Sequence, residues 1–170
     1  QKIKEIAPNI EIHISTQANT VSLHTAEFWR SFGAKRVVIS RELSKERIKY
    51  IMENKPEDME IEIFIHGAIC FAYSGRCFLS DFLSCRSANL GDCAQSCRWS
   101  YNLYAEEKNN PGQLMPREES EYGTSIFSSK DLCLRKEIPE IIEMGVDSLK
   151  IEGKLKTEYY IASVVNAYRH

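Results

Sequence analysis

The most strand-like run of the sequence is Ile61-Glu62-Ile63-Phe64-Ile65. Apolar, mostly β-branched residues crowd into this short run, a pattern typical of a buried strand. Similar runs at 10–14, 36–39, 125–127 and 148–151 predict four further strands. The chain therefore carries short strands at intervals along its whole length.

Helical patterns lie between these runs. The first places Leu23, Ala26, Trp29 and Phe32 at threefold spacing before Gly33, and the second places Ile48, Ile51 and Met52 between the N-cap residue Ser44 and Pro56. A third helix is expected at 139–144, ending at Gly145, and a last helix carries Tyr160, Ile161, Val164, Val165 and Tyr168 on one face. Alternating strands and helices favour right-handed βαβ units and a parallel sheet.

Two α/β architectures fit this order, an open doubly wound sheet and an arc of a (β/α)8 TIM barrel. Residues 15–19 hold no glycine-rich phosphate loop after the first strand, so a dinucleotide-binding sheet is disfavoured and we expect the barrel. A complete barrel usually takes about 250 residues. The 170 residues therefore predict a partial barrel over 1–170, with about five βα units.

The segment 67–123 interrupts this rhythm. It contains five of the six cysteines and the polar run 105–112, and it shows no sustained helical period. We expect a long, irregular, cysteine-rich insertion after the third strand. Long loops of this kind are usually functional or tied by a bound group, and a metal would tie this one.

Composition and charge set the remaining bounds. With 43% hydrophobic and 27% charged residues the chain is globular, and its net charge of -2 shows no basic excess that would indicate nucleic-acid binding. The longest apolar region, 61–73, is too short to span a membrane. The chain begins at Gln1 without a start Met or signal segment, which indicates a processed chain or a piece of a longer one and favours a cytoplasmic location.

Polar residues follow every expected strand. Because ligands bind at the carboxyl ends of parallel strands, these residues predict a site at one rim of the sheet. They are Ser15, Thr16, Gln17 and Asn19; Ser40, Arg41 and Glu42; His66 and Gly67, leading to Cys70; Ser128, Ser129 and Lys130, leading to Cys133; and Glu152, Gly153 and Lys154.

The cysteines permit three interpretations. In a secreted protein six cysteines predict three disulfides, whereas in a reducing compartment they predict a metal site. Structural zinc usually needs two closely spaced cysteine pairs, and only Cys93 and Cys97 come close to one. The wide, irregular spacing suits a four-iron four-sulfur (4Fe-4S) cluster better, with zinc as the alternative.

Four blocks of sequence carry a resemblance to a known family. They are Glu62–Ser80 (EIFIHGAICFAYSGRCFLS), Gly91–Trp99 (GDCAQSCRW), Ser129–Cys133 (SKDLC) and Ser148–Lys156 (SLKIEGKLK). In this order they resemble the collagenase-like peptidase family U32, and the Gly91–Trp99 block with residues 101–107 is most similar to its tRNA-hydroxylating branch. Since family members are longer and hold a (β/α)8-type domain, the resemblance implies a fragment of that domain.

The resemblance implies two functions. Some members are described as proteases, although no nucleophile or metal-bound water is identified in them. Others are oxygen-independent hydroxylases of tRNA, ribosomal RNA or ubiquinone that carry a 4Fe-4S cluster, with prephenate as oxygen source for the RNA branch. By this resemblance the cluster ligands are Cys70, Cys77, Cys93 and Cys133, with Cys97 in reserve and Cys85 spare.

We therefore expect an enzyme that forms 5-hydroxyuridine at the tRNA wobble position, with a peptidase or a zinc-stabilised non-catalytic module as alternatives. Arg41, His66, Lys150 and Lys154 at the rim are expected to hold anionic prephenate or RNA phosphate. Together with Glu152 they are the candidate catalytic residues. Trp99 and Tyr101 are candidates for stacking on a base. Unpaired edges of a partial barrel predict a homo-oligomer.

Overall fold

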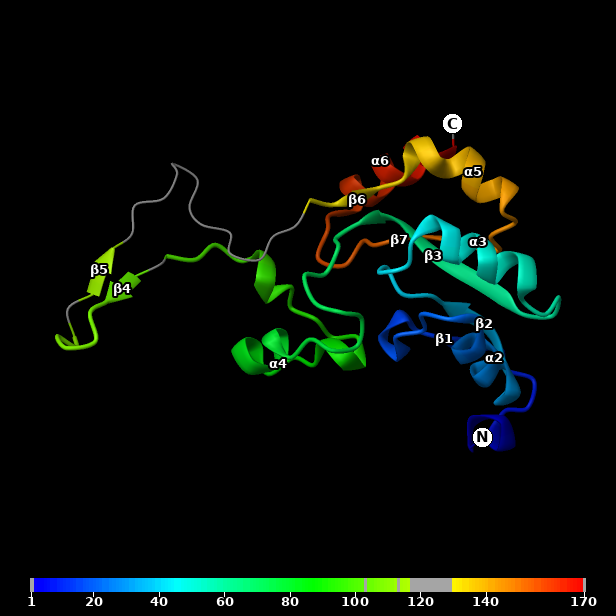
Figure 1. Cartoon of the computed structure of the whole chain (residues 1–170), viewed down its shortest axis with the longest axis horizontal. Helices are drawn as coiled ribbons and strands as arrows, with labels where there is room; N and C mark the ends of the chain where they lie inside the picture. Colours follow the sequence, from blue (N-terminus) through cyan, green and yellow to red (C-terminus); the bar gives the residue numbers. More distant parts are fainter. Residues whose placement is uncertain (1, 103, 113, 117–129, 170) are drawn as a thin grey trace. The chain divides into compact units, whose positions relative to one another are not determined.

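A computed structural model describes residues 2–102, 104–112, 114–116 and 130–169 of the chain (Figure 1). It divides into two compact units, Gln1–Cys77 with Lys130–His170 and Phe78–Ser129, and each unit is described by itself. The first unit contains α1 (Lys2–Ile6), β1 (Ile12–Ile14), α2 (Leu23–Ser31), β2 (Ala34–Val38), α3 (Lys45–Asn54), β3 (Glu60–Gly67), β6 (Leu132–Cys133), α5 (Ile138–Glu143), β7 (Ser148–Ile151) and α6 (Glu158–Arg169). The second contains α4 (Leu79–Ser84), β4 (Tyr104–Glu106) and β5 (Leu114–Pro116).

The first unit is built on a mixed five-stranded sheet. Strands β1, β2 and β3 pair in chain order and in parallel, and β7 pairs with β3 in parallel as well. The α/β class expected from the sequence is confirmed. The expectation of a purely parallel sheet is wrong, because β6 pairs antiparallel with β3, Cys133 opposite His66. The strand expected at 125–127 lies outside the described residues.

One face of β3 forms the hydrophobic core. Its residues Ile61, Ile63 and Ile65 are at most 4% exposed and pack in one cluster with residues of α2, α3 and α5. Tyr168 of α6 packs against the same cluster. Since side chains alternate across a strand, the helices that contribute to this core all pack on one side of the sheet.

The opposite face of β3 carries charge. Glu62, with a side chain 11% exposed, accepts hydrogen bonds from Lys150 Nζ (2.8 Å) and Ser148 Oγ (3.0 Å) of β7, and Arg36 of β2 lies 3.4 Å away. Burial raises the pKa of Glu62, but the hydrogen bonds from Lys150 and Ser148 and the charges of Lys150 and Arg36 outweigh burial and hold this pKa below its ordinary value. A buried carboxylate thus joins three strands through ionic contacts.

Side-chain caps start two of these helices, α2 and α3. The hydroxyl of Ser22 accepts a hydrogen bond from Thr25 N at the start of α2, and that of Ser44 accepts one from Arg47 N at the start of α3. Such caps satisfy backbone donors that have no partner within the helix. The Ser44 N-cap predicted from the sequence is confirmed.

In the described part of 67–123, the second unit contains regular elements that the sequence did not predict, namely α4, β4 and β5. Ser80 of α4 donates a hydrogen bond to Arg86 O (2.7 Å) and accepts one from Ala94 N (2.8 Å). Arg86 in turn binds Asp92 through two nitrogens. Helix α4 was missed because it has only six residues and no side-chain cap, so it leaves no periodic signal.

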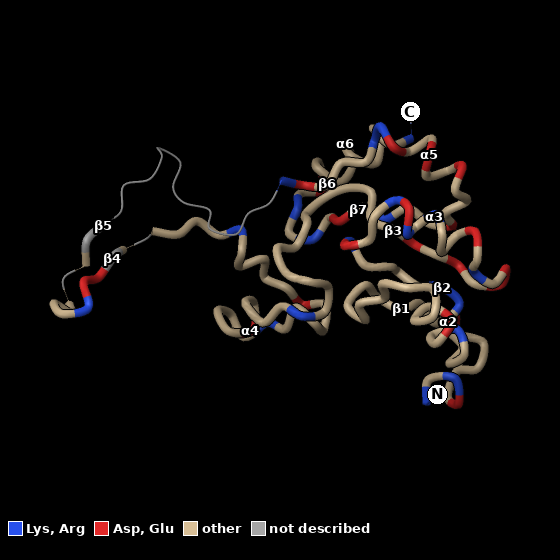
Figure 2. Tube along the Cα trace, in the orientation of Figure 1, with Lys and Arg blue, Asp and Glu red and all other residues tan. Residues whose placement is uncertain are grey.

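The last two features of the fold are the distribution of its charged residues and the length of its apolar helices. Figure 2 shows Lys and Arg interspersed with Asp and Glu along the first unit. In the described part of the chain, no helix has both the length and the apolar character that a membrane span requires.

Replacing Lys150 with Met tests the ionic contacts of Glu62. The free energy of unfolding should fall by about 1 kcal/mol at neutral pH, since solvent at Lys150 moderates the loss of a charged hydrogen bond. A depressed carboxyl pKa stabilises the fold above the unfolded-state value and loses this effect as the pH falls through the folded-state value. The difference between the variant and the wild type should therefore shrink as the pH falls below about 4.5, the ordinary value for Glu.

Urea denaturation across this pH range measures the effect. Lys49→Met is the control, because Lys49 and Glu53 are both 60% exposed and their ion pair at 3.8 Å should contribute little. A loss for Lys150→Met that is the same at neutral and acid pH would contradict the role given to Glu62.

Candidate functional site

A loop after β3, residues 68–77, carries the first two cysteines and lies against the carboxyl ends of the parallel strands. We call it the Cys70 loop. Every one of its side-chain and backbone partners described below comes from the first unit. The Cys70 loop therefore forms one wall of the candidate site.

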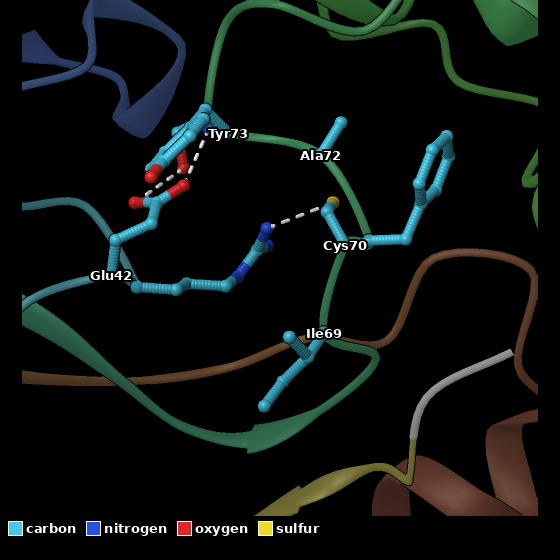
Figure 3. A pocket seen from close by; sticks show the side chains of 8 residues that line it. Glu42, Ile69, Cys70, Ala72 and Tyr73 are labelled. Atoms are coloured by element: carbon cyan, nitrogen blue, oxygen red, sulfur yellow. Dashed lines mark hydrogen bonds between the residues drawn. The ribbon is translucent and has the colours of Figure 1, made fainter. Parts of the chain in front are cut away.

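Arg41, three residues beyond β2, reaches from the sheet to the loop. Its guanidinium lies 3.8 Å from the centre of the Phe64 ring. Nη1 donates to Cys70 Sγ at 3.3 Å, the bond drawn as a dashed line to Cys70 in Figure 3. Nη2 lies 3.4 Å from Glu152 Oε2. The side chain is 10% exposed, so this cation is held by an aromatic face, a carboxylate and a thiol rather than by water.

Glu42 and Gln17 bind the turn of the Cys70 loop. Both carboxylate oxygens of Glu42 accept hydrogen bonds from Ser74, one from its N–H at 2.6 Å and one from its hydroxyl at 3.3 Å. Gln17, just after β1, accepts from Gly75 N at 3.1 Å. The hydroxyl of Thr16 lies 3.4 Å from that of Ser74.

Two glycines allow the loop to approach so closely. Gly67 has a φ of +109°, and a Cβ there would stand 2.6 Å from Glu152 O. Gly75 has a φ of +73°, and a Cβ would stand 2.1 Å from Gln17 O. Both positions thus need glycine for backbone conformation and for space.

The Cys70 loop and the end of β2 enclose a cavity of about 380 Å³. Figure 3 shows Glu42 and Tyr73 on one side of it and Ile69 and Cys70 on the other. The complete lining is Arg41, Glu42, Ile69, Cys70, Phe71, Ala72, Tyr73 and Ser74. Such a volume suits a small molecule, with the Arg41 guanidinium as the cation.

A second polar group lies at the end of β3. The hydroxyl of Tyr168 donates to Ile65 O at 3.0 Å and lies 3.2 Å from His66 Nδ1 and 3.9 Å from Cys133 Sγ. Burial raises the pKa of Tyr168 to about 12, and its hydrogen bond with Cys133 acts in the same direction. Tyr168 therefore remains a phenol at neutral pH and links α6, β3 and β6.

Of the other predicted rim residues, Ser128 and Ser129 lie outside the described residues, whereas Lys150, Glu152, Lys154 and His66 are described. Lys150 is hydrogen-bonded to Glu62, on the face of the sheet opposite the core. Glu152 accepts a hydrogen bond from Lys154 N at 2.7 Å as well as facing Arg41. Arg41 and Glu152 are thus brought to Cys70, whereas His66 belongs with Tyr168 and Cys133.

The remaining cysteines belong to the second unit. Cys93 Sγ accepts a hydrogen bond from Gln95 N at 3.2 Å, and Cys85 ends α4 in the left-handed conformation, with a φ of +53°. Trp99 is 42% exposed, and the hydroxyl of Tyr101 donates to Ser96 O at 2.5 Å.

All six cysteines are free thiols. The donor chemistry therefore suits a thiolate-bound metal or cluster. Within the described ranges no three His, Cys, Asp or Glu side chains stand together as ligands of one metal ion. Of the four expected ligands, Cys70, Cys77 and Cys133 belong to the first unit and Cys93 to the second.

Fold and site together define an α/β protein with free thiols, a buried arginine and carboxylates at the strand ends. The chain belongs to peptidase family U32, because the sequence model of this family matches residues 1–170. The resemblance seen in the four sequence blocks is thereby confirmed.

Curated relatives include RNA-modifying proteins. The chain is 46% identical over 166 residues to tRNA hydroxylation protein P1 of Bacillus subtilis and 40% identical over 204 residues to tRNA hydroxylation protein P of Escherichia coli. Each match covers 98% of this chain, but 38% and 45% of the relative. It is 38% identical over 162 residues to the 23S rRNA 5-hydroxycytidine synthase of Escherichia coli, covering 95% of this chain and 23% of that protein. No solved structure matches the chain.

Sequence reasoning missed several residues of the site. The sequence pattern indicates only a rim position for Glu42 and Gln17 and only a strand position for Phe64. Tyr168 was assigned to the apolar face of the last helix, where its hydroxyl gives no signal. The docking of Gly75 on Gln17 joins residues 58 positions apart, which no local sequence pattern records.

Replacing Gly75 with Ala should destabilise the fold more than replacing Gly145. Their φ angles are +73° and +75°, so both variants bear the same left-handed strain, about 1–2 kcal/mol. Only the Cβ at Gly75 meets a backbone atom, whereas Gly145 has open space. We expect an additional loss of about 1–3 kcal/mol for Gly75→Ala, measured by chemical denaturation. Equal losses in the two variants would show that the Cys70 loop does not dock as described.

Proposed function

We propose that this chain is part of an RNA hydroxylase, most specifically one that forms 5-hydroxyuridine at the wobble position of tRNA. The observation that carries the proposal is the match along nearly the whole chain to two tRNA hydroxylation proteins, joined by a ribosomal RNA hydroxycytidine synthase. Three relatives named for the hydroxylation of RNA pyrimidines or of tRNA support a shared chemistry. The barrel, the cofactor and the co-substrate are further parts of the same proposal.

The proposed cofactor is a 4Fe-4S cluster held by Cys70, Cys77, Cys93 and Cys133. Their free thiols suit it, since thiolates are the ligands of such clusters. The cluster would supply electrons or bind a substrate oxygen. Zinc bound by the same thiols is the alternative.

The chain's own residues would bind and orient the co-substrate. Arg41, in the cavity beside Cys70, offers a fixed cation for a carboxylate, and prephenate is the proposed oxygen source. Phe64 and Glu152 keep the guanidinium in place. Lys154, next to Glu152 at the end of β7, is proposed to hold RNA phosphate.

We further propose that the sheet is an arc of a (β/α)8 barrel. Parallel β1, β2 and β3 follow in chain order, and the helices of the core pack on one face of the sheet. An open doubly wound sheet would place helices on both faces. The site then lies at the carboxyl end of the strands, where barrel enzymes hold their active sites.

Iron analysis tests the cofactor. The protein that carries this chain, purified without oxygen, should contain about four iron and four sulfide per chain and absorb visible light. Replacing Cys70 or Cys133 with Ser should remove most of the iron, whereas Cys85→Ser should retain it. A colourless protein with one zinc ion would refute the cluster, and iron that survives loss of Cys70 would refute Cys70 as one of its ligands.

Analysis of tRNA tests the reaction. Cells that lack the protein should lose 5-hydroxyuridine-type nucleosides, and the wild-type gene should restore them. Replacing Arg41 with Met should reduce restoration at least tenfold, because it removes the cation while preserving apolar contact with Phe64. Unchanged tRNA in the deletion strain would point to another substrate, and gelatin cleavage that survives Cys→Ser replacement of all four ligands would favour the peptidase.

A further inference from the structure

We propose that Glu42 is a positioning residue that fixes the Cys70 loop before any metal binds, and so presents Cys70 and Cys77 to it. The inference deepens the proposed function and rests on it for the identity of the metal group. Its basis is the binding of one turn of the loop by acceptors at the ends of two strands.

Ser74 is the first half of this contact. It is 5% exposed, so its N–H is shielded from water and needs an acceptor within the protein. Glu42 supplies one oxygen to this N–H at 2.6 Å and its other oxygen to the hydroxyl at 3.3 Å (Figure 3). A carboxylate has no donor of its own and accepts both bonds at once.

Gly75 is the second half. Its N–H, the next along the backbone, has a separate acceptor in Gln17 Oε1 at 3.1 Å. The turn closes on itself through a hydrogen bond from Arg76 N to Tyr73 O at 3.1 Å. Two successive amides are thus bound by residues that follow β1 and β2.

The bound turn lies between the two cysteines. Ser74 is four residues after Cys70, and Gly75 is two residues before Cys77. Fixing the turn in advance reduces the backbone conformational entropy that is lost when both thiols bind one metal. The hydrogen bonds of Glu42 go to the amide and hydroxyl of Ser74, so it acts on the loop through Ser74. Its neighbour Arg41 acts differently, by direct contact with Cys70 Sγ at 3.3 Å.

Hydrogen exchange and metal loading test the proposal on the whole protein that carries this chain. In the metal-free protein, Glu42→Ala should speed exchange of the Ser74 amide about tenfold or more, while amides of β3 stay protected. Gln17→Ala should affect the Gly75 amide first. Glu42→Gln keeps an acceptor oxygen and should largely restore protection of Ser74.

Anaerobic reconstitution with iron and sulfide gives the second measurement. Glu42→Ala should slow the rise of the visible absorption about tenfold, Glu42→Gln should restore the rate, and Glu53→Ala, which removes an exposed carboxylate from α3, should match the wild type.

Three outcomes decide the matter. Unchanged exchange at Ser74 in Glu42→Ala overturns the proposal, and so does faster exchange with normal metal loading. If the wild type takes up no iron, the cluster of the proposed function fails. Reconstitution with zinc then replaces iron in the same comparison, and its rate decides whether Glu42 presents the thiols.

Discussion

The carboxylate of Glu62 is held between Lys150 and Arg36 on the strand that pairs with both β2 and β7. On the other side of the same strand, Ile61 and Ile63 fill the core beneath the helices. The two faces of β3 depend on one pairing register. In that register the isoleucines are buried in the core and the Glu62 carboxylate meets its two cations. The alignment of three strands follows from this double requirement, and the position of every strand end follows from the alignment.

The site is an extension of that register. Phe64 comes two residues after Glu62, on the same face, and its ring carries the guanidinium of Arg41. Arg41 in turn contacts Cys70 in the loop that leaves β3. The geometry near the thiol is therefore transmitted from strand to ring to guanidinium. Side chains on a paired strand place a loop more accurately than the loop could place itself.

Sequence patterns predict the elements that have a local periodic or capping signal, and they miss the elements that depend on pairing between distant segments. The run 61–65 and the Ser44 cap announce β3 and α3 because periodicity and capping are local. Strand β6 is two residues long and owes its existence to pairing with His66 and Gly67, which no local pattern records. The ends of the expected strands predict a set of polar residues at one rim of the sheet. Which of them meet, Arg41 with Cys70 or Glu42 with Ser74, depends on side-chain reach across distant segments.

The alternation of side chains between the two faces of β3 also limits which insertions and deletions this strand tolerates. A one-residue insertion or deletion before Glu62 would turn each following side chain to the other side of the sheet, which would carry the carboxylate into the core and an isoleucine to the cations. Substitutions can be absorbed one at a time, whereas a change of length alters every position at once. We therefore expect changes of length to be tolerated only outside this strand, and designed insertions should avoid it.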